Sequence, residues 1–301
     1  MTLAHGAGGK ASRRLVEELF VPELSNPALD ALGDSAVVDV DGTRLAFTTD
    51  SYVVTPLFFP GGDIGELAVN GTVNDLAMAG AVPPWLAAGF VIEEGFPVAE
   101  LRRIAASMAR AARAAGVAVA AGDTKVVERG KADGLYVNTA GVGLLDPAVE
   151  LGPARVRTGD RVLVSGTLGD HGIAVMIARG GLKLETDLAS DTAPLHELSA
   201  ALRALGPSLR WLRDPTRGGA ATALNELARA SGLAVRIEER AIPVRAEVAG
   251  ACEILGLDPL YVANEGKCLV IATRESADAV LEAMRRQPLG RESAVIGEVE
   301  D

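Results

Sequence analysis

Apolar positions along the chain follow two alternating patterns. Segments with the short, continuous or alternating apolar pattern of strands lie at residues 44–49, 117–121, 135–144, 161–165, 235–238 and 268–273. Segments with helical periodicity lie at residues 63–79, 97–115, 171–179, 194–205, 218–230, 246–255 and 276–286. Because the two patterns alternate throughout, the sequence predicts a mixed fold of the α/β or α+β type.

Two of the predicted helices carry recognisable start and stop signals. Asp63 and Glu66 have the spacing of a capping box, which predicts a helix that runs to about Ala79. Pro97 is typical of a first helical turn, and Gly116 is typical of a helix end. Small residues in the first of these helices imply close packing, and the second helix has an apolar stripe between Leu101 and Ala115.

A change of composition near the middle of the chain indicates a domain junction. Residues 146–160 (DPAVELGPARVRTGD) contain two prolines, two glycines and charges of both signs. A chain of 301 residues is long enough for one or two domains. We therefore predict an N-terminal domain over residues 1–150 and a C-terminal α/β domain over residues 151–301.

Composition and charge narrow the class of protein. Apolar residues make up 49% of the chain, enough for a full core, and the net charge of -11 argues against a nucleic-acid partner, which needs clustered Lys and Arg. No run of 18 apolar residues predicts a membrane span, and the first ten residues lack a signal-peptide pattern. Cys252 and Cys268 fall in predicted elements and are expected to be buried thiols. The expected compartment is the cytoplasm.

The opening segment GAGGKAS is rich in glycine and approaches two phosphate-binding motifs without meeting either. The P-loop pattern fails because Ala4 stands where its first glycine is required and Ala11 follows Lys10. The dinucleotide fingerprint is matched, but the few residues before Gly6 cannot supply the strand that it requires. Two interpretations stay open: a flexible terminus, or a flap whose backbone N–H groups and Lys10 fold over phosphates.

Five aspartates stand where an apolar segment meets small residues, so that their carboxylates could share one cleft. They are Asp34, Asp50, Asp75, Asp123 and Asp214. Any one of them alone is typical of a turn or a cap, but five similar contexts favour a common site. Because Mg²⁺ usually joins one or two carboxylates to nucleotide phosphates, we predict that these residues bind Mg²⁺ and ATP.

Several other polar residues are candidates for the same site. Asn70 and Asn74 lie four residues apart inside a predicted helix, where solvent exposure is one explanation and a pocket-facing role, favoured by the small residues around them, is the other. Arg217 precedes a predicted helix and could meet phosphate at its N-terminus. Surface ion pairs would explain Lys125 and Glu265, but the sharper hypothesis makes Glu265 a general base and Lys125 an electrostatic partner. Two histidines near glycines stay unassigned.

Taken together, the motifs closely resemble the family of the hydrogenase maturation protein HypE, from residue 4 to about residue 299. The matching segments are AHGAGGK, TTDSYVVTPLFFPGGDIGELAVNGTVNDLAMAGA, AGFVIEEGFP, AGDTKVVERGKADG, SGTLGDHG, DPTRGG and NEGK. The resemblance implies an α+β fold of two α/β domains of the aminoimidazole ribonucleotide synthetase-like type. It also implies a homodimer in which the N-terminal domains join strands into a barrel.

The same resemblance implies an activity and its partners. HypE proteins are carbamoyl dehydratases: a HypF-type protein places a carbamoyl group on a C-terminal cysteine, ATP drives its dehydration to thiocyanate, and HypC and HypD carry the cyanide to the iron of nickel–iron hydrogenase. ATP and Mg²⁺ are then the implied cofactors. The five aspartates correspond to the metal–ATP positions, with Thr124 among the nucleotide-binding residues. Removal of the amide protons needs a base, which matches Glu265 near Lys125.

One departure from the family pattern concerns the C-terminus. HypE chains normally continue past IGEV into a tail that ends Pro-Arg-Ile-Cys, whereas this sequence ends at Glu300 and Asp301 without the terminal cysteine. We expect that the tail has been omitted, because the rest of the pattern is intact. Two alternatives stay open: another ATP enzyme of the superfamily, such as thiamine-monophosphate kinase, and a non-catalytic ATP-binding scaffold for HypC–HypD-type partners.

Overall fold

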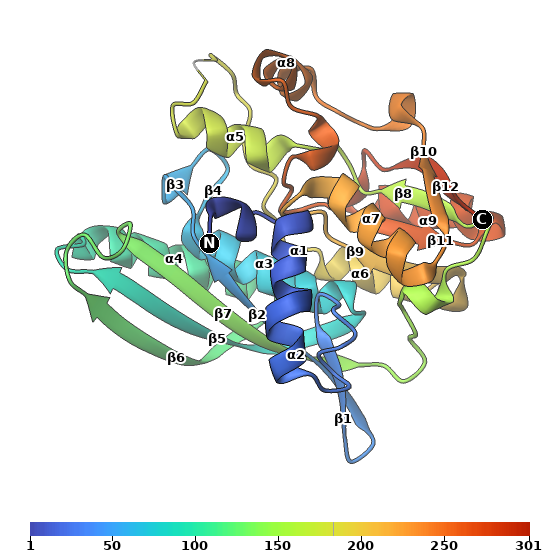
Figure 1. Ribbon diagram of the computed structural model, residues 1–301, viewed down its shortest axis with the longest axis horizontal. Helices are drawn as coiled ribbons and strands as arrows, with labels where there is room; N and C mark the ends of the chain where they lie inside the picture. Colours follow the sequence, from blue (N-terminus) through green and yellow to red (C-terminus); the bar gives the residue numbers. More distant parts are fainter. Residues whose placement is uncertain (183) are drawn as a thin grey trace.

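The chain folds around two five-stranded sheets, which a computed structural model describes for residues 1–182 and 184–301. The first sheet has the order β1-β2-β7-β5-β6 and the second the order β10-β12-β8-β11-β9. Figure 1 shows the first sheet at the lower left and the second at the right. Helix α3 (Ile64–Met78) contacts both, because it packs on β2, β5 and β7 of the first sheet and on β9 of the second.

The first sheet is antiparallel except at one edge. Its strands are β1 (Ala36–Val40), β2 (Thr43–Tyr52), β5 (Ala81–Glu93), β6 (Ala118–Val127) and β7 (Leu135–Leu145). Strand β6 runs parallel to β5, and the crossover that this requires is helix α4 (Val98–Ala114). Because β6 ends the sheet, one of its edges carries no partner strand among the described residues, and nearly all of its residues are exposed.

Helix α3 begins where its sequence signal predicts. The carboxylate of Asp63 accepts hydrogen bonds from the backbone N–H groups of Gly65 and Glu66, at 2.8 and 3.1 Å. Almost every residue of the helix is buried, including Asn70 and Asn74. Because a helix that is buried on nearly all sides leaves few polar groups to solvent, its two asparagines need partners inside the protein.

The second sheet is covered by helices on both faces. Its strands are β8 (Arg161–Val164), β9 (Leu209–Arg213), β10 (Ala234–Ile237), β11 (Leu269–Ala272) and β12 (Ala294–Glu300). The helices of this half are α5 (Asp170–Ala178), α6 (His196–Arg203), α7 (Gly219–Ser231), α8 (Ala246–Leu255) and α9 (Ala277–Arg286). Side chains alternate along β8, so that Leu163 joins the core under α6 and α9, while Val162 and Val164 join the core under α7.

Short elements complete the chain. They are α1 (Lys10–Leu15), α2 (Val21–Leu24) and a two-stranded sheet of β3 (Phe58–Phe59) and β4 (Gly62–Asp63). The predicted burial of Cys252 and Cys268 is confirmed, and neither forms a disulfide. Within residues 1–182 and 184–301, the structure contains no helix with the length and apolar character to cross a bilayer.

The predicted mixed fold is confirmed, with differences that bear on the site. Strand β2 continues to Tyr52 and β6 to Val127, so Asp50, Asp123 and Lys125 lie inside strands instead of at their ends. Strand β5 was not predicted because two prolines interrupt its pattern; they lie where its register with β7 shifts, between Val82 and Trp85. The domain boundary at residue 150 stays a prediction.

Candidate functional site

Three of the five predicted aspartates converge where α3 meets β9. Carboxylate oxygens of Asp34, Asp75 and Asp214 all lie within 4.8 Å of one another. Asp75 belongs to α3, Asp34 precedes β1, and Asp214 directly follows β9. The site is therefore assembled from both halves of the chain.

Two hydroxyl groups tie the segments that carry Asp34 and Asp75 together. The Thr48 hydroxyl on β2 lies 2.8 Å from Oδ2 of Asp75 and 2.9 Å from the carbonyl oxygen of Asp34. The Ser35 hydroxyl donates to the carbonyl oxygen of Asp75 at 3.1 Å. The segment before β1 is thus held against α3, which fixes the distance between the two aspartates.

The cluster carries more negative charge than its neighbours neutralise. Arg213 pairs through Nε with Asp34 at 2.8 Å, but its Nη2 also pairs with Glu226 at 3.0 Å. Burial raises the pKa of Asp34 to about 8 and that of Asp214 to about 6, although Arg213 opposes both shifts. Burial also raises the pKa of Asp75 well above its usual range, with Asp214 and Asp34 adding to the shift. The protein alone therefore favours protons on these carboxylates, and a bound cation would replace them.

This set of donors fits a hard divalent cation. Mg²⁺ takes oxygen ligands at about 2.1 Å, so oxygens that share one ion are at most about 4.2 Å apart. Small side-chain rotations bring oxygens that lie within 4.8 Å of one another into that range. Three carboxylates, two of them partly accessible and Asp214 buried, can therefore hold Mg²⁺ and leave part of its coordination shell to phosphate oxygens.

Asp50, Arg217 and the glycine-rich N-terminus lie beside the cluster. The charge of Asp50 contributes to the raised pKa of both Asp75 and Asp214. Arg217 Nη2 lies 3.7 Å from Oδ1 of Asp50, and its Nη1 donates to the carbonyl oxygen of Gly6 at 3.2 Å. The N-terminal segment therefore lies against the start of α7, and Lys10, the first residue of α1, is brought to the same side of the molecule.

A close backbone contact explains one glycine of that segment. Gly8 has a φ of +77°, and a Cβ atom there would lie 2.8 Å from the carbonyl oxygen of Arg217. Only glycine accepts both the left-handed backbone and this approach. The glycine-rich opening is thus shaped to pack on the Arg217 loop, whereas its predicted action as a flap over phosphates stays a prediction.

The expectation that all five aspartates converge is wrong for a single chain, because Asp123 lies elsewhere. Strand β6 is separated from β2 by β7 and β5, a total distance of about 14 Å. Asp123 is paired with Gly89, whereas Asp50 shares a row with Thr139 and Ala88, so the alternation of side chains turns the two carboxylates to opposite faces of the sheet.

Lys125 and Thr124 stay with Asp123 on the exposed edge strand. Lys125 Nζ lies 2.7 Å from Oδ2 of Asp123, and both side chains are about two-thirds exposed. The backbone N–H of Thr124 donates to Oδ1 of Asp123 at 2.8 Å. Within one chain these three residues form a surface cluster, and their roles in nucleotide binding and catalysis stay predictions.

Glu265 lies beside the main cluster and not beside Lys125. Burial raises the pKa of Glu265 well above its usual range; Asp214, Asp191 and Asp50 add to the shift, and Arg217 opposes it. The predicted proximity of Glu265 and Lys125 is therefore not found within one chain, because β6 continues along the far edge of the sheet. Glu265 keeps the partial accessibility that a general base needs.

Buried asparagines of α3 hold the segments around Glu265. Asn74 Nδ2 donates to the carbonyl oxygens of Ala193 and Glu265 at 3.1 and 3.2 Å, and its Oδ1 accepts from the N–H of Leu195 at 2.8 Å. The solvent-exposed alternative is thus excluded for this side chain. Asn74 positions backbone next to the cluster, and its contact with nucleotide stays a prediction.

Asn264 was not predicted as a site residue, although it connects three of the motifs. It is fully buried, and its Oδ1 accepts from the N–H of Gly169 at 2.7 Å. Its Nδ2 donates to the carbonyl oxygen of Pro215 at 3.0 Å. The segments SGTLGDHG, DPTRGG and NEGK therefore meet at one side chain. The sequence signal that could have found Asn264 is its position as a polar residue next to an apolar segment.

Comparison with known proteins decides the family. Residues 32–145 match the N-terminal domain of AIR synthase related proteins, and residues 157–301 match the C-terminal domain. The chain is 56% identical to the carbamoyl dehydratase HypE of Azotobacter vinelandii over 297 residues, which are 99% of this chain and 87% of that protein. The chain belongs to the HypE family. The HypE of Escherichia coli is 48% identical over 302 residues, 99% of this chain and 90% of its own.

Solved structures of HypE proteins have the same fold. HypE in a HypE–HypF complex matches with a TM-score of 0.92 at 48% identity, over 95% of this chain and 93% of that one. HypE in complex with ATP matches with a TM-score of 0.83 at 48% identity, over 99% and 89%. These similarities confirm the predicted fold of two domains of the AIR synthase type. A thiamine monophosphate kinase from Aquifex aeolicus shares the fold alone, at 20% identity and a TM-score of 0.74.

Proposed function

We propose that this protein is an ATP-dependent carbamoyl dehydratase, which converts a C-terminal S-carbamoyl-cysteine into a thiocyanate and so supplies cyanide for the iron of nickel–iron hydrogenase. Membership of the HypE family along 99% of the chain supports this activity. The observation that carries it is the cluster of Asp34, Asp75 and Asp214, which can hold a metal-bridged triphosphate without a P-loop.

The chemistry requires that an amide oxygen become a leaving group. The carbamoyl oxygen attacks the γ-phosphorus of ATP, ADP leaves, and the bond from carbon to the phosphorylated oxygen then breaks as phosphate departs. The nitrogen gives up both of its protons in the course of these steps, which leaves a carbon–nitrogen triple bond. The products are therefore the thiocyanate, ADP and phosphate. A half-buried Glu265 with a raised pKa is a strong base when ionised, and we assign it this proton removal.

The remaining residues are assigned to nucleotide binding. Asp34, Asp75 and Asp214 would hold Mg²⁺, with Asp50 beside them; when bound, the ion neutralises phosphate charge. Arg217, which lies between Asp50 and the glycine-rich segment, is placed to contact phosphate oxygens. Lys10 and the backbone N–H groups of that segment would add further donors.

We further propose a homodimer in which the first sheets of two chains form a barrel. The sheet face opposite α3 exposes large apolar side chains, among them Phe47 at 47% and Trp85 at 56%, and such patches are typical of interaction sites. The register places Asp123 and Lys125 on this same face. We therefore assign their roles in nucleotide binding and catalysis to the dimer.

The expected partners follow from the family. A relative is known in a HypE–HypF complex, which supports a HypF-type carbamoyltransferase as the source of the carbamoyl group. We also propose a HypC–HypD-type complex as the acceptor of cyanide and the cytoplasm as the compartment. The division into an N-terminal ATP-binding and dimerisation domain, residues 1–150, and a C-terminal domain, residues 151–301, is part of the same proposal.

The test uses the chain extended after residue 301 by a tail that ends Pro-Arg-Ile-Cys, as in HypE relatives, and carbamoylated on its terminal thiol. With ATP and Mg²⁺, intact-mass spectrometry should show the loss of one water. Asp75→Ala should abolish that loss and weaken Mg²⁺–ATP binding by at least about 100-fold in calorimetry, since even residues that only support a metal ligand contribute 10–100-fold. Glu253→Ala, which removes an exposed carboxylate from α8, serves as the control and should change neither.

Each other outcome has a definite meaning. ATP binding without water loss in the unsubstituted, carbamoylated chain would contradict the dehydratase and favour a non-catalytic scaffold. Phosphorylation of thiamine monophosphate would favour the kinase alternative. Unchanged Mg²⁺–ATP affinity in Asp75→Ala would contradict the assignment of the carboxylate cluster.

A further inference from the structure

Asp191 is a buried carboxylate next to Glu265 that the proposed chemistry does not use. Its side chain is only 4% exposed, and its Oδ1 accepts a hydrogen bond from the backbone N–H of Glu265 at 3.0 Å. Two residues further on, the N–H of Ala193 lies 3.5 Å from the carbonyl oxygen of Glu265. Both backbone groups of Glu265 are therefore held by the segment of residues 191–193.

The backbone at Gly266 is in close contact with the backbone at Asp191. A Cβ atom at Gly266 would lie 1.8 Å from the carbonyl oxygen of Asp191. No side chain fits there, so the glycine of the NEGK motif is required by this contact and not by its backbone angles. The backbone of Glu265 consequently cannot move without displacing Asp191.

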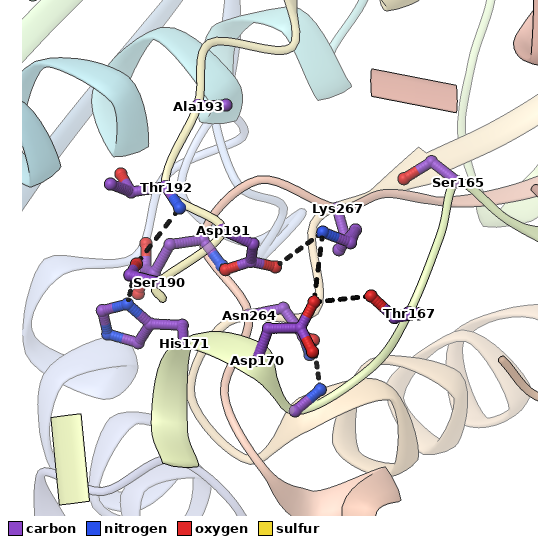
Figure 2. A network of polar contacts seen from close by, with 12 residues as sticks. Ser165, Thr167, Asp170, His171, Ser190, Asp191, Thr192, Ala193, Asn264 and Lys267 are labelled. Carbon is purple, nitrogen blue, oxygen red and sulfur yellow. Dashed lines mark hydrogen bonds and ion pairs between the residues drawn. The ribbon is translucent and has the colours of Figure 1, made fainter. Parts of the chain in front are cut away.

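A lysine from the same motif pairs with the buried Asp191. Lys267 Nζ lies 3.2 Å from Oδ2 of Asp191 and 3.8 Å from Oδ2 of Asp170, and only 13% of the lysine side chain is exposed. Asp170 is held in turn by the Thr167 hydroxyl at 2.5 Å and by Arg245 Nε at 3.2 Å. Figure 2 shows Lys267 between the two aspartates. Because a buried acidic side chain needs a partner, the contact with Lys267 compensates for the burial of Asp191 behind Glu265.

The other side of the segment is fixed by the unassigned histidine of the SGTLGDHG motif. His171 Nδ1 lies 2.8 Å from the Ser190 hydroxyl oxygen, which also accepts the N–H of Thr192 at 3.1 Å. These contacts converge on the loop around Asp191 in Figure 2. Asn70 Nδ2 reaches the Thr192 hydroxyl at 3.3 Å. The residues on either side of Asp191 are therefore anchored independently of Glu265.

We propose that Asp191 is a positioning residue for dehydration: its hydrogen bond to the Glu265 backbone, supported by Lys267, sets the direction in which the Glu265 carboxylate meets the carbamoyl nitrogen. This inference rests on the proposed function, because it assumes that Glu265 removes the amide protons. Under the same proposal, Lys267 of the NEGK motif and His171 of the SGTLGDHG motif support the loop that contains Asp191. Asp191 itself does not touch the substrate.

The experiment compares Asp191→Ala with a matched control in the tailed, carbamoylated protein. Asp160 provides the matched control, because it resembles Asp191 in three respects. It is buried, it accepts a hydrogen bond from the backbone N–H of Arg157 at 2.8 Å, and it pairs with Arg210 at 3.7 Å. Asp191→Ala should slow the first-order dehydration by about 100-fold, the cost of a misplacement near 1 Å. The Kd for Mg²⁺–ATP should stay within about twofold, since the metal ligands are separate side chains.

Two further variants complete the test. Asp191→Asn keeps an oxygen acceptor for the Glu265 N–H and should recover most of the rate. If only the charge of Asp191 mattered, Asp191→Asn would not restore the rate. Asp160→Ala should leave the dehydration rate near that of the unsubstituted protein. If Asp191→Ala does not fold, Asp191→Val, which is apolar and closer in volume to aspartate than alanine is, replaces it in the same comparison.

The outcomes separate this inference from the proposed function. Equal rates in Asp191→Ala and Asp160→Ala would overturn the positioning role, as would a parallel loss of ATP affinity. Suppose that the unsubstituted chain is active, that Glu265→Gln inactivates it and that Asp191→Ala does not. The dehydratase activity would then stand, and only the positioning role of Asp191 would be contradicted. Absence of dehydration in the unsubstituted chain would remove the proposed function itself.

Discussion

At the scale of single residues, the site is a balance between buried negative charge and the few cations around it. Arg213 pairs with Asp34 and with Glu226, and the charges of Asp214 and Asp75 also act on it. Buried carboxylates without enough counter-charge become protonated, and this raises their pKa values. A bound divalent ion would supply the missing positive charge, so the proposed metal binding would be coupled to proton release at this cluster.

That coupling predicts how Mg²⁺–ATP binding depends on pH. The folded pKa of Asp34 is about 8 and that of Asp214 about 6, both above the ordinary value of 3.8, so these groups hold protons at the lower end of this range. Binding must displace those protons; affinity should therefore rise with pH between about 6 and about 8. Calorimetry in two buffers of different ionisation enthalpy should show proton release on binding within that window.

The same shifts fix the sign of the stability change in the metal-free protein. A carboxyl whose folded pKa is raised binds its proton more tightly in the folded state than in the unfolded state. Its stabilising contribution is complete below the ordinary pKa of 3.8 and is lost as the pH rises through about 8. The free energy of unfolding without metal should thus fall across this window. A Mg²⁺–ATP affinity that does not change with pH would contradict this account of the cluster.

At the scale of elements, α3 is the part of the fold that the chain specifies most locally. Its start follows from Asp63, and its burial on all sides follows from the small and apolar residues around its two asparagines. By contrast, β5 contains two adjacent prolines, and only the pairing with β7 and β6 reveals that the ladder tolerates them at a register shift. Local sequence signals predict an element well when residues within it determine its structure. They fail when pairing with strands that are distant in the sequence determines it.

A cap variant tests the local control of α3. Asp63→Ala removes the acceptor of two backbone N–H groups in a position that is 6% exposed, and should lower the free energy of unfolding by about 1–2 kcal/mol. Urea unfolding followed by circular dichroism measures this change. Ser276→Ala at the start of α9 is the control, because its hydroxyl makes no cap hydrogen bond and instead donates to the Ser208 hydroxyl at 2.9 Å, so this variant loses a side-chain hydrogen bond but no cap. An equal loss in both variants would mean that the Asp63 cap adds nothing.

At the scale of the whole molecule, the sequence predicts which residues matter better than it predicts where they meet. Asp34, Asp75 and Asp214 stand in distinct motifs, and the fold brings them together from both halves of the chain. Asp123 has an equally typical context, but its strand continues along a free edge and turns the carboxylate to the other face. Asp191 has no sequence signal, because its partner Glu265 lies 74 residues away and the contact uses backbone.

Under the proposed dimer, activity depends on the assembly state, because Asp123 and Lys125 lie away from the main cluster within one chain. If two first sheets pack through the face opposite α3, a carboxylate introduced at Trp85 would be buried without a partner, which costs several kcal/mol. Trp85→Glu should therefore raise the Kd of the dimer by at least about 100-fold and abolish dehydration in the tailed protein, while cooperative unfolding persists. Sedimentation velocity across a concentration series measures the first effect.

Ile254→Glu on α8, an equally exposed apolar position at 65%, should leave both the dimer and the activity intact. A Trp85→Glu protein that is monomeric yet fully active would show that one chain completes the site alone, and Asp123 and Lys125 would then lose their assigned roles.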